Sequence, residues 1–177
     1  SKKEGDFSPD LYTGDSSELS LEEGIANIVE RATNECKMEQ HVVFTLKDGR
    51  KIGVFGIDTP ETATKTNPEK VRDIKVLMGQ ELYDCAQAQV DALKAENCDM
   101  IVMLCHLGVD IPSIPNRSID VLENTTGIDL CVDGHSHTVM EGGEMHNNAL
   151  LTSTGCLSGS MSTGRESVNP TLLVTVR

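Results

Sequence analysis

The stretch "DMIVMLCHLG", residues 99–108, decides the fold. Its apolar run "MIVML", residues 100–104, has the length of one strand and contains no charged residue. Such a continuous apolar run is typical of a strand covered on both faces, as in parallel sheets. A histidine and a glycine follow shortly after the run. The stretch therefore predicts a buried strand with a metal-ligand type of side chain at its carboxyl end.

The segments on either side extend this strand into a repeating unit. "KIGVFGI" (residues 51–57) and "IDLCV" (128–132) are two more apolar runs of strand length. Apolar residues recur at helical spacing in "QELYDCAQAQVDALKAEN" (80–97), and "SIDVLENTT" (118–126) favours a shorter helix. The order strand, helix, strand, helix, strand predicts a βαβαβ unit with parallel strands and right-handed crossovers.

Outside this unit the sequence predicts a hairpin, a helix and further strands. "HVVFTL" (residues 41–46) precedes a "DG" turn and pairs with the strand that follows. "SLEEGIANIVERA" (20–32) has a capping box and one apolar face, which predicts a helix. "DTPETATKTNP" (58–68) is expected to be a polar loop. "ALLTSTG" (149–155) and "TLLVTV" (171–176) are strand candidates.

Composition excludes several classes of function. The chain has 177 residues, which suits one domain, with 38% hydrophobic and 3% aromatic residues. It carries 28 acidic and 15 basic residues, a net charge of −13, which argues against binding to nucleic acid or to an anionic membrane. An anionic small substrate stays possible, because a bound divalent cation inverts the local field. No apolar run approaches the roughly 20 residues that span a bilayer, and the first ten residues lack the apolar segment of a signal peptide.

The six cysteines contain no CxxC pair, which makes a zinc ribbon or a thioredoxin-like site improbable on spacing alone. Cys105 and Cys131 lie within strand-like runs, and we expect them to be small core residues. The pair Cys105–His106 could in principle form a cysteine nucleophile with its base. Adjacent residues after a strand point apart, however, which disfavours this reading.

Polar side chains follow three neighbouring strands of the unit. They are Asp58 after the first, His106 after the second, and Asp133, His135 and His137 after the third. Because ligands bind at the carboxyl ends of parallel strands, we expect these side chains to lie along one edge of the sheet. The sequence has no GxSxG, P-loop or strand-linked GxGxxG motif that would favour another kind of site.

The "GHSH" segment favours a metal site. Two histidines at i and i+2 of an extended chain point to the same side, and neutral imidazole suits zinc, iron and similar ions. His106 would complete the set. The alternative for the histidines is a polar turn. Asp58 and Asp133 are expected to cap turns rather than to bind metal. His41 and His146 lie outside this set and are expected to be ordinary surface residues.

"RKIGVFGIDTPETATKTNPEKV", "DMIVMLCHLGVD", "RSIDVLENTTGIDLCVDGHSHTV" and "ALLTSTG" together resemble the 5′-nucleotidases of the calcineurin-like metallophosphoesterases. The resemblance implies part of an α/β/β/α sandwich with two divalent metal ions, zinc or manganese. It assigns His106 and His135 to one metal and His137 to the other. A metal-held hydroxide would attack phosphorus in a phosphate ester, most plainly a nucleotide. The family also points to an extracytoplasmic location.

The family's upstream ligand motifs, DxH, GD after a strand and GNHE, are absent from residues 1–50. We therefore expect residues 41–177 to be the C-terminal half of the catalytic domain and residues 1–40 to be an acidic loop and helix prefix that does not match the family. Alone, this fragment would be inactive and would bind one metal ion or none. The alternative is a non-catalytic domain, either for interaction or for one metal ion. Strand edges left open by missing partners would favour self-association.

Overall fold

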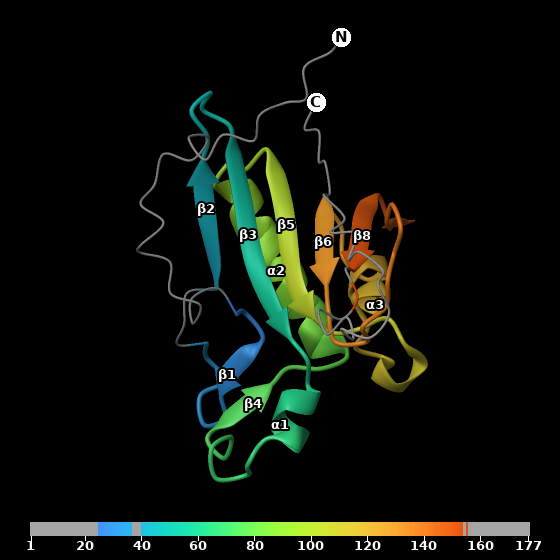
Figure 1. Cartoon of the computed structure of the whole chain (residues 1–177). Helices are drawn as coiled ribbons and strands as arrows, with labels where there is room; N and C mark the ends of the chain where they lie inside the picture. Colours follow the sequence, from blue (N-terminus) through green and yellow to red (C-terminus); the bar gives the residue numbers. More distant parts are fainter. Residues whose placement is uncertain (1–24, 37–39, 154, 156–177) are drawn as a thin grey trace.

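The computed structural model describes residues 25–36, 40–153 and 155. A six-stranded sheet of order β2-β3-β5-β6-β8-β7 dominates it (Figure 1). The four central strands β3, β5, β6 and β8 are parallel to one another, whereas β2 pairs antiparallel with β3 and β7 pairs antiparallel with β8 at the two edges. In sheet order the strands are β2 (His41–Thr45), β3 (Lys51–Asp58), β5 (Met100–His106), β6 (Leu130–Asp133), β8 (Ala149–Ser153) and β7 (Glu144–His146).

Two helices, α2 (Gln80–Ala95) and α3 (Ser118–Glu123), cover one face of this sheet (Figure 1). A short 3₁₀ turn, Ile111–Ser113, precedes α3. Alternate residues of the strands meet the helices in the main core. Its largest fully buried members include Phe55, Leu82, Leu93, Met103, Leu107, Leu122 and Leu151. None of the helices in the described ranges is long and apolar enough to cross a membrane.

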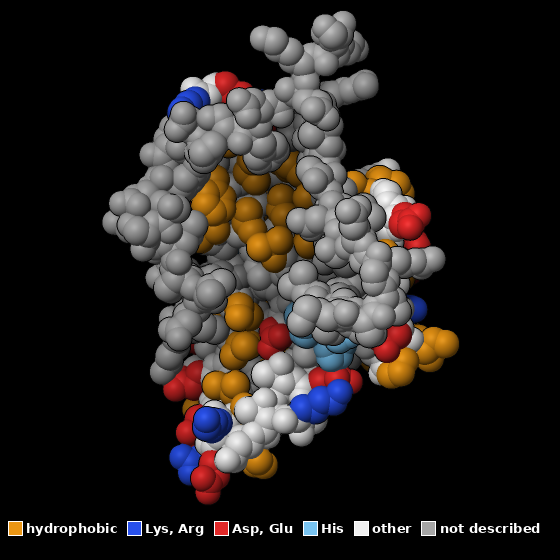
Figure 2. Space-filling view, in the orientation of Figure 1, with side chains coloured by type: hydrophobic (Ala, Val, Ile, Leu, Met, Phe, Trp, Pro, Cys, Tyr) orange, Lys and Arg blue, Asp and Glu red, His pale blue; other side chains and the backbone are white. Residues whose placement is uncertain are grey.

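The opposite face of the sheet is apolar as well. Met100, Val102 and Leu130 form a second buried cluster there. Figure 2 views the molecule from this side and shows hydrophobic side chains gathered over the middle of the sheet. The strands are thus apolar on both faces, which is why they read as continuous apolar runs.

The predicted fold class is confirmed: the chain is an α/β protein with a βαβαβ core of parallel strands followed by further strands. The hairpin is also confirmed as β2 and β3. The described residues supply one helix layer and one large sheet of the expected sandwich. The strand predicted at residues 171–176 lies outside the described residues.

The predicted helix at residues 20–32 is wrong over its described part. Ile25 forms an isolated parallel bridge with Gly56, β1 (Ile28–Glu30) pairs with β4 (Ile74–Val76), and a turn follows β1. The reason is a set of tertiary bonds: the Ala26 amide donates to the Gly56 carbonyl at 2.9 Å, and the fully buried Asn27 side chain bonds the backbone of Asp58. These bonds override a periodicity that favoured a helix.

Two short elements were missed by the sequence patterns. The segment expected to be a polar loop after β3 contains a helix of five residues, α1 (Glu61–Lys65). The polar segment before β8 contains the edge strand β7. Figure 1 places α1, β1 and β4 beyond the end of β3, at the same end of the sheet as the carboxyl end of β5.

Candidate functional site

The carboxyl ends of three parallel strands carry the predicted polar residues. Asp58, His106 and Asp133 are the last residues of β3, β5 and β6. The register places Asp58 directly opposite His106 across the β3–β5 pair. Figure 2 shows histidine side chains at this end of the sheet, beside acidic side chains. Parallel pairing therefore brings these residues to one edge, as the topology requires.

His106 and His135 are neighbours in space. Their ring centroids are 5.0 Å apart, and the rings meet edge to face at 71°. Gly134 allows this approach, because a Cβ at that position would lie 3.0 Å from Nδ1 of His106. The two imidazoles come from different strand ends and can serve one ion between them.

The backbone of "GHSH" differs from the extended chain that the sequence suggested. His135 has φ of +70° and His137 has φ of +53°, both in the left-handed region. The argument that i and i+2 side chains share a side applies only to extended backbone, so it does not hold here. His137 is thus in the same loop as His135, but strand alternation does not bring the two imidazoles together.

The Asp133 carboxylate connects the loops that carry the two histidines. Its Oδ1 accepts hydrogen bonds from the amides of Leu107 at 3.0 Å, Gly108 at 3.2 Å and Gly134 at 2.8 Å. Its Oδ2 accepts from the hydroxyl of Ser118 at 2.6 Å. Asp133 is 5% exposed and Ser118 is fully buried. The carboxylate is therefore engaged on both oxygens by donors of the chain itself.

A second bond joins the same two loops further out. The Val109 amide donates to the hydroxyl of Ser136 at 3.2 Å, and that hydroxyl lies 3.0 Å from the hydroxyl of Thr138. The loop after β6 is thus fixed against the loop after β5 at two points.

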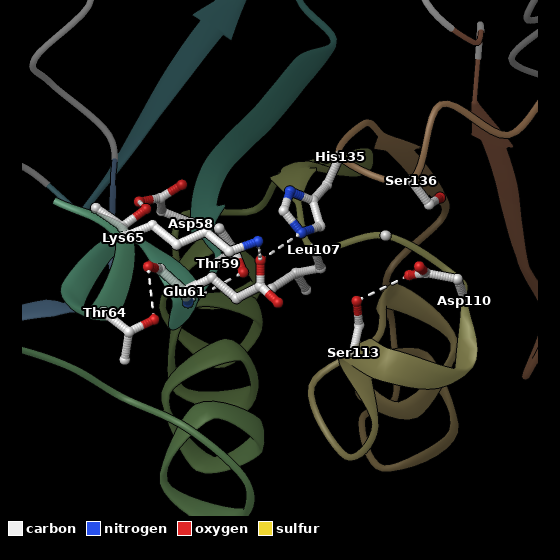
Figure 3. A network of polar contacts seen from close by, with 12 residues as sticks. Asp58, Thr59, Glu61, Thr64, Lys65, Leu107, Asp110, Ser113, His135 and Ser136 are labelled. Carbon is white, nitrogen blue, oxygen red and sulfur yellow. Dashed lines mark hydrogen bonds and ion pairs between the residues drawn. The ribbon is translucent and has the colours of Figure 1, made fainter.

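Glu61 is the acidic partner of His135 and was not found from the sequence. Its Oε2 lies 3.1 Å from Nε2 of His135, and the same oxygen forms an ion pair with Lys65 at 2.5 Å (Figure 3). The Lys65 ammonium, followed by His135, holds the pKa of Glu61 below its ordinary value. A usable signal existed: Glu61 comes three positions after the end of a strand whose carboxyl end was already suspected. The short helix that presents it carried no such signal.

Asp58 is bonded to Thr62 and Asn27 rather than to the histidines. Its Oδ2 accepts from the hydroxyl of Thr62 at 2.7 Å, a bond between two side chains. Its backbone is held by Asn27. The side-chain bond to the backbone of this turn is made by Thr59 instead, whose hydroxyl accepts the Glu61 amide at 3.3 Å.

The cysteines at this edge do not form a nucleophile. Burial raises the pKa of the Cys105 thiol well above its ordinary value, and contacts with Cys131 and Asp133 act in the same direction. Its Sγ lies 3.4 Å from Sγ of Cys131 and 3.3 Å from Oδ1 of Asp133. A reactive cysteine needs a lowered pKa, so the environment favours an inert thiol. Cys131 is fully buried, as expected for a core residue.

The two remaining histidines are engaged elsewhere. His41, at the start of β2, contacts the carbonyl of the Gln89 side chain at 2.8 Å and Glu96 at 2.9 Å. His146, in β7, lies 3.4 Å from Glu144. Both are partnered by side chains of their own surroundings, away from the strand ends that carry His106 and His135.

The donors present fit a metal ion only in part. Within residues 25–36, 40–153 and 155, no group of three or more His, Cys, Asp or Glu side chains is arranged to hold an ion. His106 and His135 bring two imidazole rings together, with centroids 5.0 Å apart. Both carboxylate oxygens of Asp133 already accept hydrogen bonds, Oδ1 from backbone amides and Oδ2 from Ser118. The described residues therefore do not assemble the self-sufficient mononuclear site that was the alternative reading.

Comparison with known proteins confirms the predicted resemblance. No family model matches the chain. The trifunctional nucleotide phosphoesterase protein YfkN of Bacillus subtilis strain 168 is 33% identical over 102 residues, or 57% of this chain and 6% of that protein. A 5′-nucleotidase of Diplobatis ommata is 29% identical over 101 residues, covering 57% of this chain and 16% of that protein.

Solved structures confirm the fold. The calcineurin-like phosphoesterase YfkN of Bacillus subtilis superposes with a TM-score of 0.60 at 20% identity, over 75% of this chain and 46% of that chain. The sulfate thiohydrolase SoxB of Thermus thermophilus gives a TM-score of 0.63 at 18% identity, over 73% of this chain and 22% of that one. The chain thus has the fold of calcineurin-like phosphoesterases. It spans only 6% and 16% of the lengths of the two curated relatives named above.

Proposed function

We propose that this chain contributes half of the active site of a metal-dependent phosphoric ester hydrolase of the 5′-nucleotidase kind. The observation that carries the proposal is the pair His106 and His135, brought edge to face at the carboxyl ends of β5 and β6. The relatives in sequence are named as a nucleotide phosphoesterase and a 5′-nucleotidase, which supports a nucleoside monophosphate or a related phosphate ester as substrate.

The proposed ligands are His106 and His135 for one ion and His137 for a second, with zinc or manganese as the expected metals. When bound, such ions lower the pKa of a bound water and stabilise charge on the phosphoryl oxygens. The residues of the chain would hold and orient these ligands. Glu61 contacts Nε2 of His135, and metal-binding histidines commonly have a carboxylate on the second ring nitrogen, which fixes tautomer and ring orientation.

The remaining ligands are proposed to come from residues outside the motifs of this sequence. DxH, strand-linked GD and GNHE are absent from residues 1–50. We therefore propose that residues 41–177 form the C-terminal half of the catalytic domain, after a prefix at residues 1–40. On this proposal the purified chain hydrolyses AMP negligibly and binds one metal ion or none. The family resemblance adds an extracytoplasmic location, which cell fractionation would test.

The first experiment asks whether the histidine pair is the metal site. Mn²⁺ added to the full chain should broaden the imidazole NMR signals of His106 and His135 before those of His41. His106→Ala and His135→Ala should each abolish this binding, whereas His41→Ala is the matched control, since His41 is paired with Gln89 and Glu96. Equal effects of all three substitutions would refute the assignment.

The second experiment asks whether the chain is catalytically complete. The phosphate released from AMP is measured with Zn²⁺ or Mn²⁺ present, for the wild type and for His106→Ala. Robust turnover that depends on His106 would support the hydrolase and overturn the half-site. Turnover that survives His106→Ala would contradict both.

Self-association through strand edges stays part of the proposal. β2 and β7 are the outer strands of the described sheet. Sedimentation across a concentration series measures it, and a monomer at every concentration would contradict it.

A further inference from the structure

We propose that Asp133 is a positioning residue whose carboxylate sets the distance between the imidazoles of His106 and His135. Its Oδ1 atom makes the bonds that hold the two histidine-bearing segments together. Oδ1 accepts the amides of Leu107 and Gly108, which directly follow His106, and also the amide of Gly134, which directly precedes His135. A single atom therefore fixes the backbone on both sides of the histidine pair.

The second oxygen connects these bonds, which together we call the Asp133 clamp, to the helix α3. Oδ2 accepts the hydroxyl of Ser118 at 2.6 Å, and Ser118 is the first residue of α3. The Ser118 amide in turn donates to the Gly108 carbonyl at 3.1 Å. Asp133, Gly108 and Ser118 thus form a closed ring of hydrogen bonds. Such a ring leaves the loop after β5 little freedom to move relative to α3.

A carboxylate suits this position better than any neutral side chain. It accepts on both oxygens and donates on neither, and every group that faces it here is a donor. Hydrogen bonds to an ionised acceptor are also stronger than neutral ones. An asparagine would keep one carbonyl for the amides, but this neutral acceptor would hold them by weaker bonds, and its NH₂ group could not accept the bond that the Ser118 hydroxyl donates. Burial at 5% exposure makes this weakening costly.

The functional consequence rests on the proposed metal site, whereas the clamp itself does not. Two imidazoles bind one ion only when their spacing and tilt are held. The backbone bonds of Asp133 hold that spacing, while Glu61 orients the ring of His135. Without the Asp133 carboxylate, two bonds would still join these segments: the Val109 amide to the Ser136 hydroxyl at 3.2 Å, and the Gly134 amide to the Cys105 carbonyl at 3.2 Å.

The test uses the metal-free full chain and a matched control. Asp129→Asn is the control, because Oδ2 of Asp129 accepts the Ile101 amide at 2.7 Å and so bridges the same two strands at their opposite end. Asp133→Asn should speed hydrogen exchange of the Leu107 and Gly108 amides by about tenfold, because a neutral acceptor holds them more weakly than a carboxylate does. The Gly134 amide should respond less, because it also donates to the Cys105 carbonyl at 3.2 Å. Asp133→Asn should also weaken the nuclear Overhauser contact between the rings of His106 and His135.

Asp129→Asn should leave both readouts at their wild-type values, even if it lowers stability. The proposal is overturned if Asp133→Asn changes neither readout, or if the two variants change them equally. Should Asp133→Asn fail to fold, Ser118→Ala replaces it. Removal of the Oδ2 bond alone should raise exchange at the same three amides by a smaller factor. Wild-type amides of Leu107 and Gly108 that exchange as fast as unbonded loop amides would also refute the clamp.

A metal titration separates this inference from the proposed function. With Mn²⁺, Asp133→Asn should weaken binding by about 10–100-fold, as is usual for residues that support metal ligands. Asp129→Asn should bind as the wild type does. If the wild-type chain binds no Mn²⁺, the proposed metal site fails, and the exchange and ring measurements still decide the clamp.

Discussion

Gly108→Ala should disturb the candidate site directly, and the structure offers a control with the same backbone angle. Gly108 has φ of +79°, and a Cβ there would lie 3.2 Å from Oδ1 of Asp110, 3.3 Å from Cδ2 of His135 and 3.3 Å from Cβ of Ser136. Gly142 also has φ of +79°, but a Cβ there meets nothing within 4 Å. The two substitutions therefore share backbone strain and differ in contacts.

The expected magnitudes follow from these two terms. A left-handed backbone costs an L-residue about 1–2 kcal/mol. The lower entropy of the unfolded chain offsets about 0.4–1 kcal/mol of this. Gly142→Ala should therefore lower the free energy of unfolding by at most about 1.6 kcal/mol. Gly108→Ala adds crowding against three neighbours, which typically costs about 1–3 kcal/mol.

Urea denaturation of both variants measures the difference, provided that the slope with denaturant stays constant. The Cδ2–Hδ2 NMR signal of His135 supplies a local readout, which should move in Gly108→Ala and stay in Gly142→Ala. Equal destabilisation of the two variants, with an unmoved His135 signal, would refute the packing of the loop after β5 against His135.

Three further predictions concern charge, thiol chemistry and the core. Lys65→Ala should raise the pKa of Glu61 toward its ordinary value, because Lys65 is the largest cause of the depression; a carboxyl NMR titration measures it. The stability that this lowered pKa gives is complete above pH 4.5 and is lost as the pH falls through the pKa of Glu61 in the folded chain. The difference in free energy of unfolding between the wild type and Lys65→Ala should therefore shrink in acid. Burial raises the pKa of Cys85 from 9.0 to about 11, so its thiol should resist alkylation at about pH 8 until the chain is unfolded, as mass spectrometry would show. The same shift makes stability fall as the pH rises from 9.0 toward 11, and rapid labelling of the native chain would contradict the burial. Leu93→Ala empties a fully buried position and should cost about 2–5 kcal/mol in urea denaturation, where a much smaller loss would mean that the core is looser than described.

The strand ends could be predicted from the sequence because two independent rules agree there. Continuous apolar runs mark the parallel strands, and parallel strands end at one edge. His106 and Asp133 therefore lie where the pattern put them. The prediction needed only the order of elements, not the conformation of any loop.

The finer geometry could not be predicted, because it depends on contacts between distant segments. Nothing local in the sequence marks Ser118 as the partner of Asp133, fifteen positions away. The left-handed backbone of His135 and His137 is likewise set by the surrounding loop bonds. Asn27 is another example: its segment has the apolar period of a helix, but two bonds to the backbone of Asp58 hold it in a non-helical conformation.

The bonds of Asp133 also carry a consequence for the order of folding. Its Oδ1 joins residues 26 and 25 positions apart, so these bonds form only after the chain has closed the crossover through α3 and paired β5 with β6. Contacts of long sequence separation belong to the slow steps of folding. A half-folded chain therefore carries two histidines without a fixed spacing. An ion held between the two histidines would bind the folded chain and not the half-folded one, and would therefore stabilise the folded chain. Ion binding during refolding would then indicate that β5 and β6 have paired.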